Sequence, residues 1–298
     1  MTAPLLARVR PERRRQFVRL LLALLGAAMV LILLTATGRD EKVPTYRHYV
    51  ALGDSYTAAP FVPLTDLAEG CYRSSNNYPH LVAAAMHVVD LEDRSCSGAR
   101  TRDLISSQTT ATRRQVRPQL EALTPATDLV TVGLGVNDFG LYGRMASKCR
   151  QSARSCRLYD ERASFGVILD QLRPALVQSL DLVRQRAPHA RVLLIGYPRV
   201  LPPAGDCLRL PRMRPQDRAT FRAVNLRLRE EMQAAARETD VEFVDFYSAS
   251  LGHDVCSRNP WVQGRLGSSR TGAALHPLPA GQAALARLLI STLRQPPG

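Results

Sequence analysis

The feature that most constrains the fold is a regular alternation of short apolar runs with longer amphipathic segments after residue 46. Most of the short runs are continuously apolar, as expected for strands buried on both faces of a parallel sheet. The five candidate strands are residues 49–52, 88–91, 129–132, 192–195 and 241–244.

Between these strands, hydrophobic residues recur at helical spacing. Apolar side chains step by one, three or four positions over residues 168–183 and again over 221–232. A last helix is expected over 279–293. Alternating strands and helices predict a doubly wound α/β fold, a three-layer α/β/α sandwich. No repeat or linker interrupts the pattern, so residues 46–295 are expected to form one domain.

The N-terminal segment has the pattern of an export signal. A basic stretch (1–19) precedes an uncharged hydrophobic run (20–38), which a short tether (39–45) joins to the domain. At about 1.5 Å per residue, the run just spans the roughly 30 Å of a bilayer core. Arginines before it favour a cytoplasmic N-terminus and an exported remainder. The run is either an uncleaved signal-anchor helix, which its length slightly favours, or a signal peptide cleaved near residues 36–38.

The distribution of charge along the chain indicates which classes of binding partner to expect. The formal net charge is +14, but no block rich in Lys or Arg lies within the expected domain, and aromatic residues make up only 6% of the chain. Because these aromatics do not interleave with the arginines, nucleic-acid binding is not expected. A basic exterior attracted to anionic lipid or cell wall is the simpler interpretation.

Six cysteines follow the export segment. Export places them in an oxidising compartment, where an even number predicts disulfides. Six cysteines allow many pairings, of which the sequential one is the simplest. No C-x-x-C pair is present, so neither a thiolate zinc site nor a redox pair is expected. The cysteines are Cys71, Cys96, Cys149, Cys156, Cys207 and Cys256.

Four residues that could take part in catalysis lie at the carboxyl edge of the expected sheet, where the functional sites of such folds form. Ser55, Gly98 and Asn137 follow the first three strands, and His276 stands just before the last helix. A hydroxyl, glycine-flanked turns, a carboxamide and an imidazole are the parts of an acyl-transfer site: nucleophile, oxyanion donors and general base.

Each of these residues also has an ordinary structural interpretation. Ser55 could cap a helix, Asn137 could form an Asx-turn, and Gly98 could serve a plain turn. His276 could be a surface or capping residue. Their occurrence together, in this order and at these places in the fold, favours the functional interpretation.

The sequence resembles the SGNH (GDSL-type) hydrolase superfamily, whose four blocks occur here in order. The blocks are Gly53-Asp54-Ser55, Gly98, Gly135-Val136-Asn137-Asp138 and His276. The resemblance spans residues 49–289 and implies a mostly parallel, flavodoxin-like five-stranded sheet. It also implies that Ser55 is the nucleophile and His276 the base. The oxyanion hole would then consist of the Ser55 and Gly98 N–H groups and the Asn137 amide.

The cysteine pattern is similar to that of the secreted actinobacterial lipase/esterase branch of this superfamily. The resemblance implies three disulfides, Cys71–Cys96, Cys149–Cys156 and Cys207–Cys256. We therefore expect an exported or membrane-tethered serine ester hydrolase, monomeric and without metal or cofactor, acting on acyl esters that include lipids. The same residues would serve a carbohydrate O-acetyl esterase or an acyltransferase. The alternative outside enzymes is a degenerate module that binds envelope lipid or glycan.

The sequence departs from the family at the partner of the base. The family often has Asp three residues before the catalytic histidine, where this chain has Ala273. In the same branch a main-chain carbonyl can accept the Nδ1 proton. We therefore predict a Ser–His dyad in which the carbonyl of Ala273 or Ala274 orients His276. His253 and Asp254 form a rival base and carboxylate outside the family position.

Overall fold

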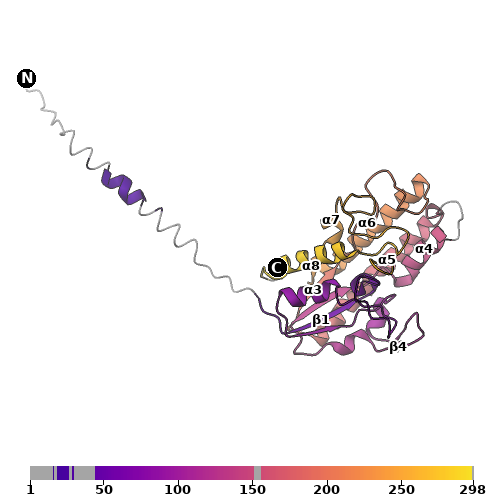
Figure 1. The fold of residues 1–298 in the computed structure, drawn as a ribbon. Coiled ribbons are helices and arrows are strands. Elements are labelled where there is room, and N and C mark those ends of the chain that lie inside the picture. The colour runs from indigo at the N-terminus through magenta and orange to yellow at the C-terminus, as the bar shows by residue number, and fades with distance from the viewer. Residues whose placement is uncertain (1–15, 17–18, 27–28, 30–43, 151–155, 297–298) are drawn as a thin grey trace, which may run out of the picture. The chain divides into compact units, whose positions relative to one another are not determined.

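The structure is a computed structural model that describes residues 16, 19–26, 29, 44–150 and 156–296 (Figure 1). The chain divides into two units, Met1–Val43 and Pro44–Gly298. In the first unit, residues 19–26 are helical. Most of the predicted hydrophobic helix (20–38) and tether lies outside the described residues. Of the helices that are described, none is both long and apolar enough to cross a membrane.

The second unit is built on a five-stranded parallel sheet with the order β2-β1-β5-β6-β7. This is the flavodoxin-like order, in which strands are added on one side of β1 first and on its other side from β5 onward. Each strand overlaps a predicted one, and β2 begins two residues later than expected. The strands are β1 (His48–Gly53), β2 (Asp90–Asp93), β5 (Leu129–Gly133), β6 (Arg191–Ile195) and β7 (Glu242–Val244).

Helices cover both faces of this sheet (Figure 1). On one face α5 (Arg162–Arg186) packs against α6 (Pro215–Glu238), and on the other α3 (Tyr78–Ala85) packs against α8 (Pro279–Leu293). Proline in the first turn starts three of these four, where a missing N–H costs no helical hydrogen bond. The shorter helices are α2 (Ser55–Ala58), α4 (Leu141–Arg150) and α7 (Phe246–Ala249), and the 3₁₀ turns are η1 (Thr101–Leu104), η2 (Gln119–Ala122), η3 (Asp138–Gly140) and η4 (Tyr159–Glu161).

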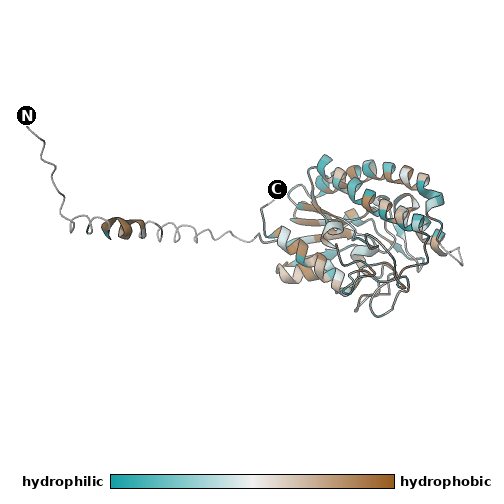
Figure 2. Cartoon of the chain, turned by 90° about the horizontal axis from the view of Figure 1, so that it is seen from above, coloured by the Kyte–Doolittle hydropathy of each residue, from teal (hydrophilic) through white to brown (hydrophobic). Residues whose placement is uncertain are grey.

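Alternate residues of the central strands supply two separate cores. Val50 and Leu52 of β1 belong to the core beneath α5 and α6, whereas Tyr49 and Ala51 belong to the core beneath α3 and α8. The long helices carry both hydrophilic and hydrophobic residues (Figure 2). Burial on both faces explains why the strands are continuously apolar.

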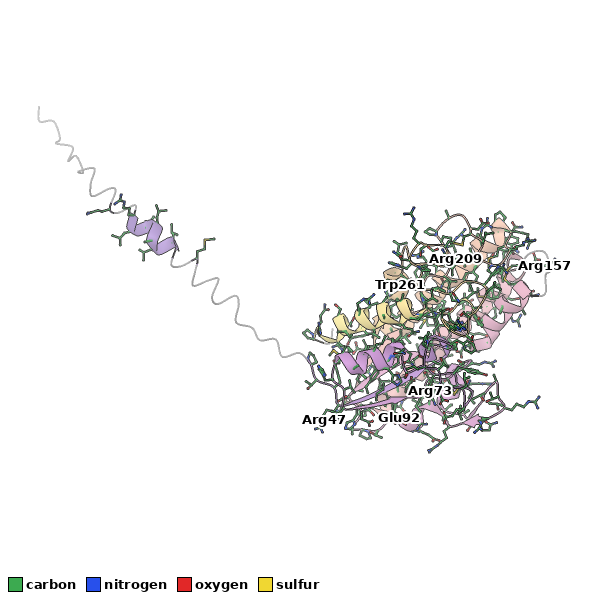
Figure 3. All side chains as sticks on the ribbon, in the orientation of Figure 1. Arg47, Arg73, Glu92, Arg157, Arg209 and Trp261 are labelled. Carbon is green, nitrogen blue, oxygen red and sulfur yellow. A yellow bond between two sulfur atoms is a disulfide. The ribbon has the colours of Figure 1, made fainter. Side chains whose placement is uncertain are left out.

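Loops at the carboxyl edge of the sheet are tied by disulfides. The structure contains Cys71–Cys96, Cys149–Cys156 and Cys207–Cys256, the pairs that the family resemblance implied. A small antiparallel hairpin of β3 (Gln108–Thr109) and β4 (Gln115–Val116) follows the loop that contains Cys96. The sequence analysis did not predict it. On the exterior, arginines such as Arg47, Arg157 and Arg209 are exposed to solvent (Figure 3).

Candidate active site

Ser55 begins α2 immediately after β1. The carboxylate of Asp54 caps this helix by accepting a hydrogen bond from the Tyr56 N–H at 2.8 Å, and the Asp54 N–H donates to the Gly133 carbonyl. The turn from strand to helix is tight. A Cβ at Gly53 would lie 2.2 Å from the Thr57 Oγ1, so only glycine fits there. This turn leaves Ser55 partly exposed at the carboxyl edge of the sheet.

His276 lies directly beside Ser55. Its Nε2 is 2.8 Å from the Ser55 Oγ, and its Nδ1 is 2.8 Å from the Ala274 carbonyl oxygen. Because that carbonyl can only accept, Nδ1 carries the proton and Nε2 presents its lone pair to the hydroxyl. The Nδ1 acceptor expected at position 273 or 274 is thus the carbonyl of Ala274.

The surroundings of His276 keep its ring neutral. The side chain is buried at 6% exposure, and this burial lowers the pKa of His276 to about 4, against a smaller opposing effect of the Ala274 carbonyl. The ring of Tyr56 lies 4.8 Å from the imidazole, centroid to centroid, and that of Tyr142 lies 5.8 Å away. The Tyr56 hydroxyl also donates to the Leu275 carbonyl at 2.7 Å. At neutral pH the imidazole is therefore available as a base.

Gly98 forms a turn beside the second strand. Its φ of +84° lies in the left-handed region that favours glycine. The Asn137 Nδ2 donates to the Ala99 carbonyl at 3.0 Å, which joins the loop after β5 to this turn. Because Nδ2 has two hydrogens, one remains for a ligand. Among the described residues, the N–H groups of Gly98 and Ser55 also have no acceptor.

The buried carboxyl group of Asp54 lies beneath the turn that contains Ser55. The Tyr197 hydroxyl donates to Asp54 Oδ2 at 2.5 Å and accepts from the Val136 N–H at 3.1 Å. Burial raises the pKa of Asp54 to about 7, although the hydrogen bonds from Tyr197 and the Tyr56 N–H oppose the rise. Through these contacts, segments that follow β1, β5 and β6 are held together.

The rival pair of the sequence analysis is not assembled as a base and its carboxylate. His253 Nδ1 lies 2.8 Å from the Asn259 carbonyl, and the ring stacks on Trp261 with centroids 3.8 Å apart. Asp254 is buried and accepts from the Cys256 N–H through Oδ1. Both residues therefore have structural contacts of their own.

Two buried glutamines support the site and carry no signal in the sequence. Gln282 Nε2 donates to the Tyr56 carbonyl while its Oε1 accepts from the Tyr78 N–H, so it links α8 to α2 and α3. Gln119 bonds both the N–H and the carbonyl of Gly53. An isolated glutamine matches no motif, so sequence reasoning did not identify either residue.

An apolar cavity opens beside the serine and the histidine. Tyr56 and Leu275, the chain neighbours of Ser55 and His276, form part of its wall. The rest of the wall includes Tyr142 and Met145 of α4 and Phe221 and Leu228 of α6. Such a wall suits a hydrocarbon chain. Within the described part of the chain, no group of three or more His, Cys, Asp or Glu residues could hold a metal ion.

Comparison with known proteins shows that the chain is similar to lipases. The model of the GDSL-like Lipase/Acylhydrolase family matches residues 51–284. Lipase 2 of Streptomyces coelicolor is 34% identical over 267 residues, which cover 85% of this chain and 88% of that protein. The structure is similar to phospholipase A1 of Streptomyces albidoflavus NA297 (TM-score 0.69, 26% identity) and to the extracellular lipase of Streptomyces rimosus (TM-score 0.69, 28% identity). Each comparison covers 84% of this chain and 100% of the other.

Proposed function

The chain belongs to the GDSL-like lipase/acylhydrolase family and is a carboxylic ester hydrolase, and from this premise we propose that it cleaves acyl esters through a dyad of Ser55 and His276. The observation that supports the dyad most directly is the double contact of His276, with Nε2 against Ser55 Oγ and Nδ1 against the Ala274 carbonyl. That arrangement fixes the tautomer a general base requires.

The proposed reaction has two halves. Ser55 Oγ attacks the ester carbonyl carbon while His276 takes the hydroxyl proton, and the alcohol then leaves with that proton. Water attacks the acyl-serine with the same base, which releases the carboxylic acid and restores Ser55. In both halves, the negative oxygen accepts hydrogen bonds from the Ser55 and Gly98 N–H groups and from Asn137 Nδ2.

The acyl group is proposed to occupy the apolar cavity between α4 and α6. Tyr56 and Leu275, the chain neighbours of Ser55 and His276, line the cavity, so it lies next to the serine to which the acyl group would be attached. This favours acyl esters longer than acetate, and the similar proteins named lipase and phospholipase A1 support the same substrate class. A series of p-nitrophenyl esters should show kcat/KM rising from acetate to longer acyl chains. A maximum at acetate would favour the O-acetyl esterase alternative.

Export through the N-terminal segment is part of the proposal. Three disulfides in residues 71–256 are typical of a chain that matures where thiols oxidise, and the similar lipase of Streptomyces rimosus is extracellular. We propose that residues 1–38 direct export. Fractionation and the mass of the mature protein test this. Recovery of the chain in the cytoplasm would contradict it, and the mass distinguishes a cleaved segment from a retained anchor.

Labelling with a fluorophosphonate probe tests the nucleophile. The wild type should be labelled, Ser55→Ala should not be, and His276→Ala should be labelled far more slowly because its serine lacks a base. Labelling that survives Ser55→Ala would remove Ser55 as the nucleophile.

A further inference from the structure

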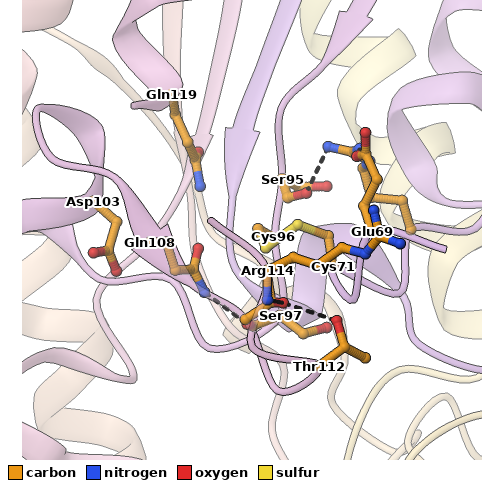
Figure 4. The surroundings of a disulfide bond; sticks show 12 residues. Glu69, Cys71, Ser95, Cys96, Ser97, Asp103, Gln108, Thr112, Arg114 and Gln119 are labelled. Carbon is orange, nitrogen blue, oxygen red and sulfur yellow. Dashed lines mark hydrogen bonds and ion pairs between the residues drawn. A yellow bond between two sulfur atoms is a disulfide. The ribbon is translucent and has the colours of Figure 1, made fainter. Parts of the chain in front are cut away.

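A third buried glutamine, Gln108, lies beside the turn that contains Gly98, and the reaction proposed above does not use it. Gln108, in β3, has only 8% of its surface exposed. Its Nε2 donates to the Ser97 carbonyl oxygen at 2.9 Å (Figure 4). This hydrogen bond therefore restrains the peptide group that joins Ser97 to Gly98.

The direction of that peptide group decides where the Gly98 N–H points. The Ser97 carbonyl and the Gly98 N–H are opposite ends of one planar trans unit, so they face opposite ways. A donor that holds the carbonyl on the buried side therefore directs the N–H to the other side. Glycine needs such a restraint because its backbone can adopt other conformations at little cost.

Other contacts of the turn hold the neighbouring peptides. The Ser97 N–H donates to the Cys71 carbonyl and the Ala99 N–H to the Cys96 carbonyl, each at 3.0 Å. The disulfide Cys71–Cys96 closes the same region (Figure 4). These contacts leave the Ser97 carbonyl to Gln108. A hydrogen bond accepted by a carbonyl also polarises its peptide and strengthens the N–H at the other end as a donor.

We propose that Gln108 is the positioning residue of the oxyanion hole, acting through the Ser97–Gly98 peptide to aim and strengthen the Gly98 N–H. The inference rests on the proposed function, which makes Gly98 an oxyanion donor. Since the oxyanion exists only in the transition state and the tetrahedral intermediate, Gln108 contributes to kcat and leaves substrate binding nearly unchanged.

Steady-state hydrolysis of p-nitrophenyl butyrate by Gln108→Ala tests the proposal. We expect kcat to fall by about tenfold to a hundredfold, part of the usual cost of losing one oxyanion donor, with KM within about twofold of the wild type. The matched control is Gln115→Ala on the partner strand β4. Gln115 is exposed and its side chain, among the described residues, bonds the Thr109 hydroxyl alone, so its loss should leave kcat unchanged.

Gln108→Glu distinguishes a role of Gln108 in positioning the Gly98 N–H from a role in holding the β3–β4 hairpin. An ionised carboxylate cannot donate to the Ser97 carbonyl, so kcat at a pH of about 8 should fall at least as far as in Gln108→Ala. Burial favours the protonated acid, whose O–H restores a donor. The ratio of variant to wild-type kcat should therefore rise as the pH is lowered from about 8 to about 5.

Two results for Gln108→Ala would each overturn the proposal: a kcat equal to that of the wild type, or an effect confined to KM. A third result would also overturn it: a loss of kcat equal to the fraction of unfolded protein in near-UV circular dichroism, together with a ratio of Gln108→Glu to wild-type kcat that does not depend on pH. Fluorophosphonate titration of the same samples keeps the two hypotheses apart. A wild type that does not react at Ser55 refutes the proposed function, whatever Gln108 does.

Discussion

The two sides of the site are held in different ways. The turn at residues 96–99 is fixed by a disulfide, by the buried side chain of Gln108 and by the left-handed backbone of Gly98. The loop at residues 263–278 is fixed largely by its own backbone: the Gln263 N–H donates to the His276 carbonyl, and the His276 N–H to the Ala273 carbonyl. The first geometry therefore depends on the identity of side chains, whereas the second depends on the path of the chain.

The largest effect is expected at Asn137, whose side chain is hydrogen-bonded to the turn of the first side. Asn137→Ala removes one proposed oxyanion donor and the link to the Ala99 carbonyl, so kcat should fall by about 10²–10³-fold. The measurement is steady-state ester hydrolysis, with exposed Asn76→Ala as the control. Unchanged kcat would mean that Asn137 only shapes its loop.

The disulfide of the same turn should have the next largest effect. Replacing Cys71 and Cys96 together by Ala loosens the segment that contains Gly98. A displacement of a catalytic group by about 1 Å can cost about a hundredfold, so we expect kcat to fall by tenfold or more while far-UV circular dichroism stays native. The control is the pair Cys207 and Cys256, changed in the same way. Loss of activity and of secondary structure together would give the bond a role in global stability alone.

On the second side, the pH profile tests the base. The pKa of His276 is lowered to about 4 by burial, and only the neutral ring can accept a proton. The value of kcat/KM should therefore stay level as the pH falls to about 5 and then decline with a midpoint near 4. A midpoint between 6 and 7 would mean that the imidazole is more hydrated than its burial indicates.

The smallest effects are expected at Ala274 of the second side, which contacts His276 through its carbonyl, and at Asp254, which lies outside both sides. Ala274→Ser keeps the carbonyl that faces Nδ1, and Asp254→Asn keeps an acceptor for the Cys256 N–H, so both should retain nearly full kcat. A loss on the order of 10⁴ in Asp254→Asn, as a wrong tautomer can cause, would replace the dyad by a triad. Such a result would also remove the contrast between the two sides.

The sequence predicted those parts of the molecule that repeat a pattern. All five sheet strands were expected, and the signal is strongest in the central strands β1 and β5, which are largely apolar because they are buried on both faces. The edge strand was predicted to begin at Val88, because Val88 and Val89 are β-branched and apolar. In the structure Val89 is 72% exposed and precedes β2, which begins at Asp90. The hairpin of β3 and β4 was not predicted, since two-residue strands carry no periodicity.

For the site, motif order located the four groups, and the structure places Ser55 and His276 in contact. The supporting glutamines were not found. The side chains of Gln108, Gln119 and Gln282 bond main-chain atoms 11, 66 and 226 residues away, and only the folded chain shows which amide meets which peptide. The predicted hydrophobic helix of residues 20–38 lies mainly outside the described residues and stays a prediction.

The acceptor that faces His276 Nδ1 is a main-chain atom, which every amino acid supplies. A base with a carboxylate partner depends on the side chains at two positions, whereas the proposed base depends on the side chain of His276 and on the path of the loop. Positions 273 and 274 can therefore drift in side chain during evolution as long as the loop keeps its shape. A search for relatives that demands an aspartate three residues before the histidine would discard chains whose base is intact.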